Sequence, residues 1–284
     1  MAMDPEQNEV APRDQYTHGH HESVLRSHTW RTVANSAAYL IPHLVRGDVV
    51  LDLGCGPGTI SVDLADRVSP GRVVGVDAAS GIVEQAAAHA ADTGTENAQF
   101  VVGDAYALPF EDEVFDVVHA HQVLQHLARP IDALREAIRV LKPGGVLAVR
   151  DVDYGGVTWF PPLPGLADWM STYQAVARYD QGEPDAGRML KAWVRAAGFE
   201  QVACTASVWC FASDAERDWW GSSWSVRATE SAFAAHAVEG GMADVDGLRA
   251  ISRAWLDWKE DPDGWMQMPH GEVIARKPLA DPSR

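Results

Sequence analysis

The chain has 284 residues, of which 46% are hydrophobic, and a formal net charge of −17. This is the composition of an ordinary globular protein, and the length suffices for one large domain or two small ones. The negative charge and the lack of a Lys/Arg cluster argue against nucleic-acid binding, which needs basic surfaces. No apolar run approaches the ~20 residues of a membrane span, and the polar N-terminus lacks the apolar core of a secretory signal.

The cysteine pattern and the first residues predict little structure. Cys55, Cys204 and Cys210 form neither a disulfide framework nor a C-x-x-C metal pair. Residues 1–15 are polar and without periodicity, which predicts a disordered leader. We therefore expect a cytoplasmic protein with reduced cysteines and without a metal site.

The next segment, residues 16–46, is predicted to form a helical flap. Apolar residues recur at helical spacing in its second half, and Pro42 suggests a break. Its polar start holds His18, His20 and His21, but no further ligand is spaced with them as a metal site requires. These polar residues are explained equally well as the solvated start of a helix or as contacts to a ligand.

A glycine-rich loop follows at residues 54–58. The apolar run Val49–Leu53 before it predicts a buried parallel strand, and Thr59–Val68 after it predicts a helix. Glycines at every second position let the backbone turn sharply and let a ligand approach the helix N-terminus. Cys55 is expected to fill this turn rather than act as a nucleophile, because no base stands beside it in the sequence.

The glycine spacing differs from that of a dinucleotide-binding loop. The dinucleotide fingerprint is G-x-G-x-x-G, whereas here the third glycine comes one residue earlier and Asp52 precedes the loop. A carboxylate at this point would repel a pyrophosphate and would attract a positively charged ligand. The pattern resembles motif I of the class I S-adenosylmethionine-dependent methyltransferases, whose ligand carries an ammonium and a sulfonium and no phosphate.

Two more strands are predicted to end in acidic residues at the same edge of the sheet. The first ends at Asp77, 19 residues after the third glycine, about where an acid accepts hydrogen bonds from ribose hydroxyls. The second runs into the loop Gly103-Asp104-Ala105, which resembles the adenine-binding segment of the same family. This resemblance implies that Ile82 lies beneath the adenine.

Histidines gather where the fourth predicted strand ends. Residues 114–127 hold this strand and its exit loop, including His121, Gln122 and His126. Open parallel sheets bind ligands at the carboxyl ends of their strands. By resemblance to the family, His121 and Gln122 flank the methionine part of the cofactor. His126 matches a histidine common in the family, and it is either structural or a general base.

A fifth strand is predicted after the Lys-Pro-Gly-Gly run at residues 142–145, which is highly typical of the same family. A helix that begins at Pro130 precedes it. Asp151, Asp153 and Tyr154 leave this strand at the edge where the ligand is expected. They would either contact the substrate or cap a loop.

The character of the sequence changes after residue 155, where ten of the eleven tryptophans lie. Residues 165–181 and 186–197 are predicted to be helical, 200–212 to form a sixth strand, and 271–277 a seventh. The stretch between these two strands is too long for a hairpin and carries aromatic residues at helical spacing. We interpret it as a helical insertion whose aromatic stripe is core rather than pocket, because large rings bury well anywhere.

The motifs over residues 44–155 resemble the ubiquinone/menaquinone-biosynthesis-like small-molecule branch of the class I methyltransferases. The resemblance implies an α/β fold with a seven-stranded, mostly parallel Rossmann-like sheet, helices on both faces and the last strand antiparallel. We expect a single domain over residues 16–284. It would consist of the flap, a cofactor-binding core over 47–155, and substrate-side helices, the last two strands and the insertion over 156–284.

The resemblance also implies S-adenosylmethionine as cofactor and methyl transfer to an oxygen, nitrogen, carbon or sulfur atom of a small-molecule acceptor. Histidines 20, 21 and 126 are the candidate bases, needed only if the acceptor must lose a proton. Neither nucleic acid nor a membrane is expected as a partner, and exposed tryptophans would be consistent with a homodimer. The implied cofactor contacts are Tyr16, Arg31, Asp52, Gly54, Cys55, Gly56, Gly58, Asp77, Ala78, Ile82, Gly103, Asp104, Ala105, His121 and Gln122.

Two other functions remain open on the sequence alone. One is a non-catalytic protein that binds S-adenosylmethionine as a sensor or as a subunit of a larger enzyme, since its sequence would look the same. The other is a nicotinamide-dependent oxidoreductase, which is also an α/β nucleotide binder. The glycine spacing, Asp52 and the Gly103-Asp104-Ala105 loop argue against this second alternative.

Overall fold

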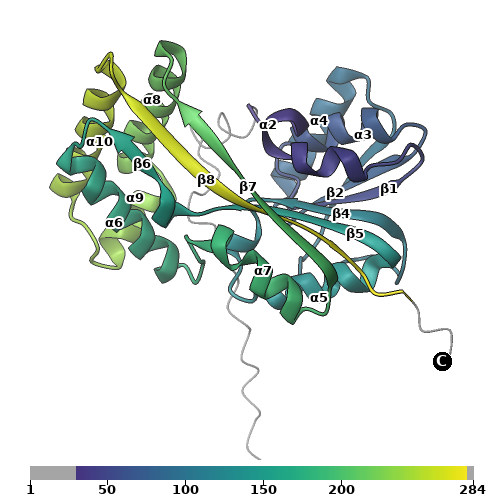
Figure 1. The fold of residues 1–284 in the computed structure, drawn as a ribbon. Helices are drawn as coiled ribbons and strands as arrows, with labels where there is room; N and C mark the ends of the chain where they lie inside the picture. The colour runs from purple at the N-terminus through teal and green to yellow at the C-terminus, as the bar shows by residue number, and fades with distance from the viewer. Residues whose placement is uncertain (1–29, 280–284) are drawn as a thin grey trace, which may run out of the picture.

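The computed structural model describes residues 30–279, and these residues form a mixed sheet flanked by helices (Figure 1). The parallel strands are β1 (Val49–Leu53), β2 (Arg72–Asp77), β3 (Ala98–Val102), β4 (Phe115–His121) and β5 (Leu141–Val152). Their order in space is β3-β2-β1-β4-β5, so the direction of winding reverses between β1 and β4. In open α/β sheets, ligands bind at such a reversal.

The remaining strand pairs are antiparallel and all involve β8, so the last strand runs opposite to the others, as predicted. Strand β8 (Trp265–Arg276) pairs with β5 and with the short β6 (Thr158–Phe160), and β7 (Glu200–Phe211) pairs with β8. The predicted sixth and seventh strands are thus β7 and β8. Strand β6 adds an eighth strand that was not predicted, and β8 begins at Trp265 rather than at Gly271. Both differences have one cause, because β6 exists through its pairing with the early part of β8.

Helices cover both faces of the parallel strands (Figure 1). One face carries α2 (Val33–Ser36), η1 (Ala38–His43), α3 (Thr59–Val68) and α4 (Ser80–Thr93), and the other carries α5 (Pro130–Val140) and α7 (Ala186–Ala196). Successive strand residues point to opposite faces. Accordingly Val50 packs in the cluster beneath α3, and the next residue, Leu51, packs in the cluster beneath α5.

The described part of the predicted flap consists of α2 and η1. The break expected at Pro42 lies instead at Ala37, whose backbone leaves the helical region between the two helices. Pro42 itself lies inside η1. The fixed φ of proline is compatible with a short 3-10 helix.

Four further helices form what we call the helical lid, which packs at the N-terminal end of β8 (Figure 1). They are α6 (Pro164–Tyr179), α8 (Asp214–Glu230), α9 (Ala232–Glu239) and α10 (Val245–Glu260). Trp169, Trp224, Trp255 and Trp258 are fully buried between them, so the predicted aromatic stripe is core. Within residues 30–279, no helix has both the length and the apolar character that crossing a membrane requires.

Candidate functional site

A cavity of about 420 Å³ opens at the carboxyl ends of β1, β2 and β4, where the strand order reverses. This volume lies in the range of small-molecule sites, roughly 300–1,000 Å³. Predicted site residues line it from separate loops, namely Arg31, Asp52, Gly54, Cys55, Gly56, Asp77, Ala78, Ile82, Gly103, Asp104, Ala105, His121, Gln122 and His126. Tyr16, His20 and His21 lie outside the described residues, and Gly58 does not line the cavity.

The glycine loop owes its shape to backbone conformations that other residues rarely adopt. Gly54, Gly56 and Gly58 have φ values of 67°, 54° and 82°. A Cβ on Gly54 would collide with the side chain of Val123, which lines the cavity from the loop after β4. A Cβ on Gly58 would lie 3.0 Å from Phe100. Gly58 is therefore required for packing at the start of α3, whereas Gly54 and Gly56 form part of the cavity wall.

Asp52 is buried, and both of its carboxylate oxygens have partners within the chain. Oδ2 accepts a hydrogen bond from Ser61 Oγ at 2.5 Å, and Oδ1 lies 2.8 Å from His119 Nδ1. A carboxylate has about four lone-pair sites, so these contacts do not exhaust its capacity to accept. Asp52 nevertheless acts first as a brace between β1, α3 and β4.

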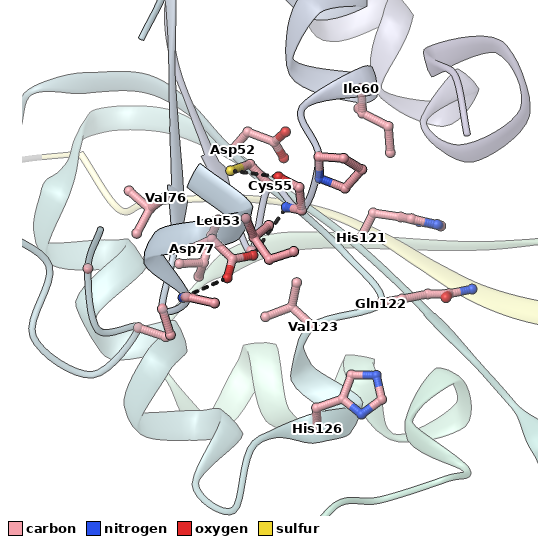
Figure 2. Close-up of a pocket in the computed structure, with 18 of the residues that line it drawn as sticks. Asp52, Leu53, Cys55, Ile60, Val76, Asp77, His121, Gln122, Val123 and His126 are labelled. Atoms are coloured by element: carbon pink, nitrogen blue, oxygen red, sulfur yellow. Dashed lines mark hydrogen bonds between the residues drawn. The ribbon is translucent and has the colours of Figure 1, made fainter. Parts of the chain in front are cut away.

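Asp77 links the end of β2 to the glycine loop (Figure 2). Its Oδ2 accepts from the Gly56 N–H at 3.2 Å, and its Oδ1 accepts from the Ala79 N–H at 3.1 Å. Cys55 is buried beside it, and burial raises the pKa of the Cys55 thiol, which agrees with a space-filling role. Asp104 is exposed and accepts from the Tyr106 N–H at 2.8 Å, which shapes its own loop.

The opposite side of the cavity carries His121 and Gln122 (Figure 2). Arg31 Nη2 donates to Gln122 Oε1 at 2.6 Å, which joins the N-terminal segment to the end of β4. Gln122 Nε2 lies 2.8 Å from Nε2 of the buried His270 on β8. Sequence analysis missed His270, because the seventh strand was predicted to begin one residue later and the contact spans 148 positions.

The two histidines that line the cavity are neutral at ordinary pH. Burial and the charge of Arg31 lower the pKa of His126 to about 3, and Gln125 Nε2 donates to its Nε2 at 3.0 Å. Burial and two arginines hold the pKa of His121 well below its usual range. Its Nδ1 lies 3.5 Å from Arg150 Nη1, and its Nε2 has no hydrogen-bond partner among residues 30–279. This environment disfavours His126 as a general base.

Asp151, near the end of β5, and Asp153 and Tyr154, just after it, make other contacts and do not line the cavity. Asp151 accepts from the Gln125 N–H at 3.2 Å, and both carboxylate oxygens of Asp153 accept from Arg188. Tyr154 packs against Tyr173 with 4.0 Å between ring centroids. In the described part of the chain, no three His, Cys, Asp or Glu side chains are grouped so as to hold a metal ion.

The chain is similar in sequence to methyltransferases. Residues 44–201 match the family model described as a methyltransferase domain. An uncharacterized methyltransferase of Schizosaccharomyces pombe is 33% identical, with 94% of this chain and 98% of that protein covered. A demethylmenaquinone methyltransferase of Clavibacter sepedonicus is also 33% identical, over 63% of this chain and 75% of its own. The solved structure of the cyclase SpnF is 26% identical, with 90% and 81% covered and a TM-score of 0.53.

Proposed function

The chain belongs to the methyltransferase family, and we propose that it binds S-adenosylmethionine in the cavity and transfers a methyl group to a small-molecule acceptor. The observation that carries the proposal is the convergence of the predicted cofactor residues on one cavity at the strand-order reversal. The cofactor would supply a methyl carbon bonded to a positively charged sulfur. The chain's own residues would bind it, orient it and exclude water.

Each end of the cavity suits a different part of this cofactor. Asp77 has lone pairs left to accept from the two ribose hydroxyls, and the loop at Asp104 with Ile82 would hold the adenine. Arg31 is the only Lys or Arg among the described lining residues, so it would pair with the carboxylate of the methionine part. Gly54 and Gly56 would let the backbone approach the atoms between these ends.

The geometry favours catalysis by positioning rather than by proton transfer. Holding two reacting groups in line can itself lower a barrier by about 7–11 kcal/mol. His121 and His126 are neutral, and their depressed pKa values make them weak bases. The acceptor would therefore reach the cavity already nucleophilic, or lose its proton to a group outside the described residues. His20 and His21 remain candidates for that role.

Removal of the Asp77 carboxylate tests the ribose assignment. Because hydrogen bonds to a charged acceptor contribute about 1.5–3 kcal/mol each, Asp77→Ala should weaken binding of S-adenosylhomocysteine at least tenfold. The measurement is calorimetric titration, with circular dichroism to confirm the fold. Asp246→Ala, which removes an exposed carboxylate on the lid, is the matched control and should bind normally. Unchanged affinity in Asp77→Ala would refute the assignment.

The alternatives are separated by parallel titrations and by turnover. Binding of NADH instead of S-adenosylmethionine would favour the oxidoreductase. Tight S-adenosylmethionine binding without production of S-adenosylhomocysteine from any acceptor would favour a sensor or another activity on this fold. The similarity to SpnF suggests what such another activity could be, since that protein is a cyclase. Turnover with small phenolic, amine or aromatic acceptors would support the proposal.

A further inference from the structure

A chain of hydrogen bonds runs from the cavity into the sheet behind it. Arg31 Nη2 contacts Gln122 Oε1 at 2.6 Å, Gln122 Nε2 contacts His270 Nε2 at 2.8 Å, and His270 Nδ1 contacts the Met268 carbonyl at 3.0 Å. The first two residues line the cavity, whereas His270 does not. These hydrogen bonds therefore connect Arg31, in the N-terminal segment, to strand β8.

The direction of each bond in this chain is fixed by chemistry. A carbonyl oxygen only accepts, so His270 Nδ1 must carry the ring proton and donate to Met268. Burial and two nearby arginines lower the pKa of His270 well below its usual range, so the ring is neutral and its Nε2 accepts. Gln122 must then present its amide N–H to His270 and its carbonyl oxygen to Arg31. A reversed amide would place N–H groups against the guanidinium.

The backbone and the side chain of Gln122 are held by separate contacts. Its φ is 55°, in the left-handed region that side chains other than glycine rarely adopt. Its N–H donates to the Arg150 carbonyl at 2.7 Å, which fixes the backbone but not the side-chain amide. His270 is 1% exposed and lies 4.4 Å from the Trp209 ring, so it offers a rigid acceptor to that amide.

We infer that His270 is a positioning residue for the cofactor's carboxylate, acting through Gln122 on Arg31. The inference rests on the proposed function. Arg31 would meet the carboxylate in an orientation set before binding, so less freedom would be lost when the cofactor binds. A long arginine side chain loses substantial rotamer entropy when it is ordered, and the chain of hydrogen bonds removes part of that cost in advance.

Two ligands separate this role from a merely structural one. S-adenosylhomocysteine carries the amino-acid part, whereas 5′-methylthioadenosine has the same adenosine and lacks the carboxylate. In calorimetric titrations, His270→Phe should weaken binding of S-adenosylhomocysteine about tenfold and leave 5′-methylthioadenosine within twofold, in line with one hydrogen-bonded contact. His270→Gln places an acceptor near the position of Nε2 and should restore most of the affinity.

Coupling to Arg31 completes the test. Arg31→Gln should show the same ligand selectivity. Adding His270→Phe to it should produce little further loss, because both changes act on the same contact, that between Arg31 and the ligand carboxylate. If His270→Phe does not fold by circular dichroism, His270→Leu makes the same comparison with a smaller apolar side chain. Equal weakening of both ligands, or weakening of neither, would overturn the role of His270. If the unaltered protein binds neither ligand, the proposed function itself fails.

Discussion

At the scale of single residues, most polar side chains around the cavity already have partners within the chain. Asp77 accepts two backbone N–H groups, Asp52 holds Ser61 and His119, and Gln122 bridges Arg31 and His270. Side chains locked by a second layer of contacts keep their orientation when a ligand arrives. The side chains of the cavity wall are thus held in place by contacts within the chain before any ligand binds.

Asp151 provides a prediction at this scale that concerns stability. Burial raises the pKa of Asp151 to about 8, whereas an unfolded Asp titrates near 3.9. Between these values the folded state binds a proton that the unfolded state releases, so this residue lowers stability as pH rises. Asp151→Asn stays neutral and keeps an acceptor for the Gln125 N–H. Between pH 5.5 and 7.5, we expect the difference in free energy of unfolding between Asp151→Asn and the native protein to shift by about 2–3 kcal/mol in favour of the variant.

Urea unfolding of both proteins at several pH values measures this effect. The lowered pKa values of His121, His126 and His270 have the opposite effect. Below the ordinary histidine pKa, the unfolded chain binds protons that these buried rings do not, so their contribution to stability rises with pH. Taking the difference between the two proteins at each pH cancels the contribution of the histidines. Parallel stability curves would show that Asp151 does not titrate in this window.

At the scale of elements, the sequence pattern predicted the helices and strands whose formation depends mainly on nearby residues. Strand β1 and helix α3 have the predicted bounds, and β2 ends at Asp77 as predicted, because each is a short run whose residues fit one period and whose ends carry turn residues. Strand β6 and the early part of β8 were missed, since three residues at 158–160 have no readable period and form a strand only by pairing with β8.

Two glycines in helices allow a prediction about contacts between elements. A Cβ on Gly221 of α8 would lie 2.6 Å from Lys259 Cβ and 2.9 Å from the Trp255 carbonyl of α10, whereas a Cβ on Gly81 of α4 would meet no neighbouring atom within 4 Å. Gly81→Ala should raise the free energy of unfolding by about 0.5–1 kcal/mol through helix propensity. Gly221→Ala should lower it by about 1–3 kcal/mol, because overpacking outweighs the same gain.

The two variants control for each other in one denaturation experiment. Both replace a helical glycine by alanine, so any difference in sign reports the space around the position. If both variants were stabilised, α8 and α10 would have to lie further apart than the close approach at Gly221 indicates.

At the scale of the whole molecule, the parts missed from sequence are those that join distant segments. The glycine loop, Asp77 and Asp104 were predicted from short motifs and their spacing, and the structure brings them to one cavity. His270 was missed because its role depends on Gln122, which is 148 positions away. The tryptophans were correctly assigned to a core, but which helices share that core became apparent only in the fold.

The same long-range connections lead us to expect a single cooperative unit. Strands β5, β7 and β8 each run for 12 residues, and β7 and β8 continue from the α/β core to the lid. No tryptophan lines the described cavity, and the fully buried ones lie in the lid. Tryptophan fluorescence therefore reports mainly on the lid, with Trp193 of α7 as a reporter in the core, while a cofactor would bind in the core. If both unfold together, a ligand of the core must stabilise the lid as well.

Thermal unfolding with and without S-adenosylhomocysteine tests this coupling. At a concentration 100 times its dissociation constant, a ligand stabilises the folded state by about 2.7 kcal/mol, which for a chain of this size raises Tm by about 5–10 °C. We expect the transition followed by tryptophan fluorescence to rise by the same amount as that followed by circular dichroism. Asp77→Ala at the same ligand concentration should show a much smaller rise. Separate transitions, with only the one followed by circular dichroism responding to ligand, would mean that the lid unfolds independently despite the strands that connect it to the core.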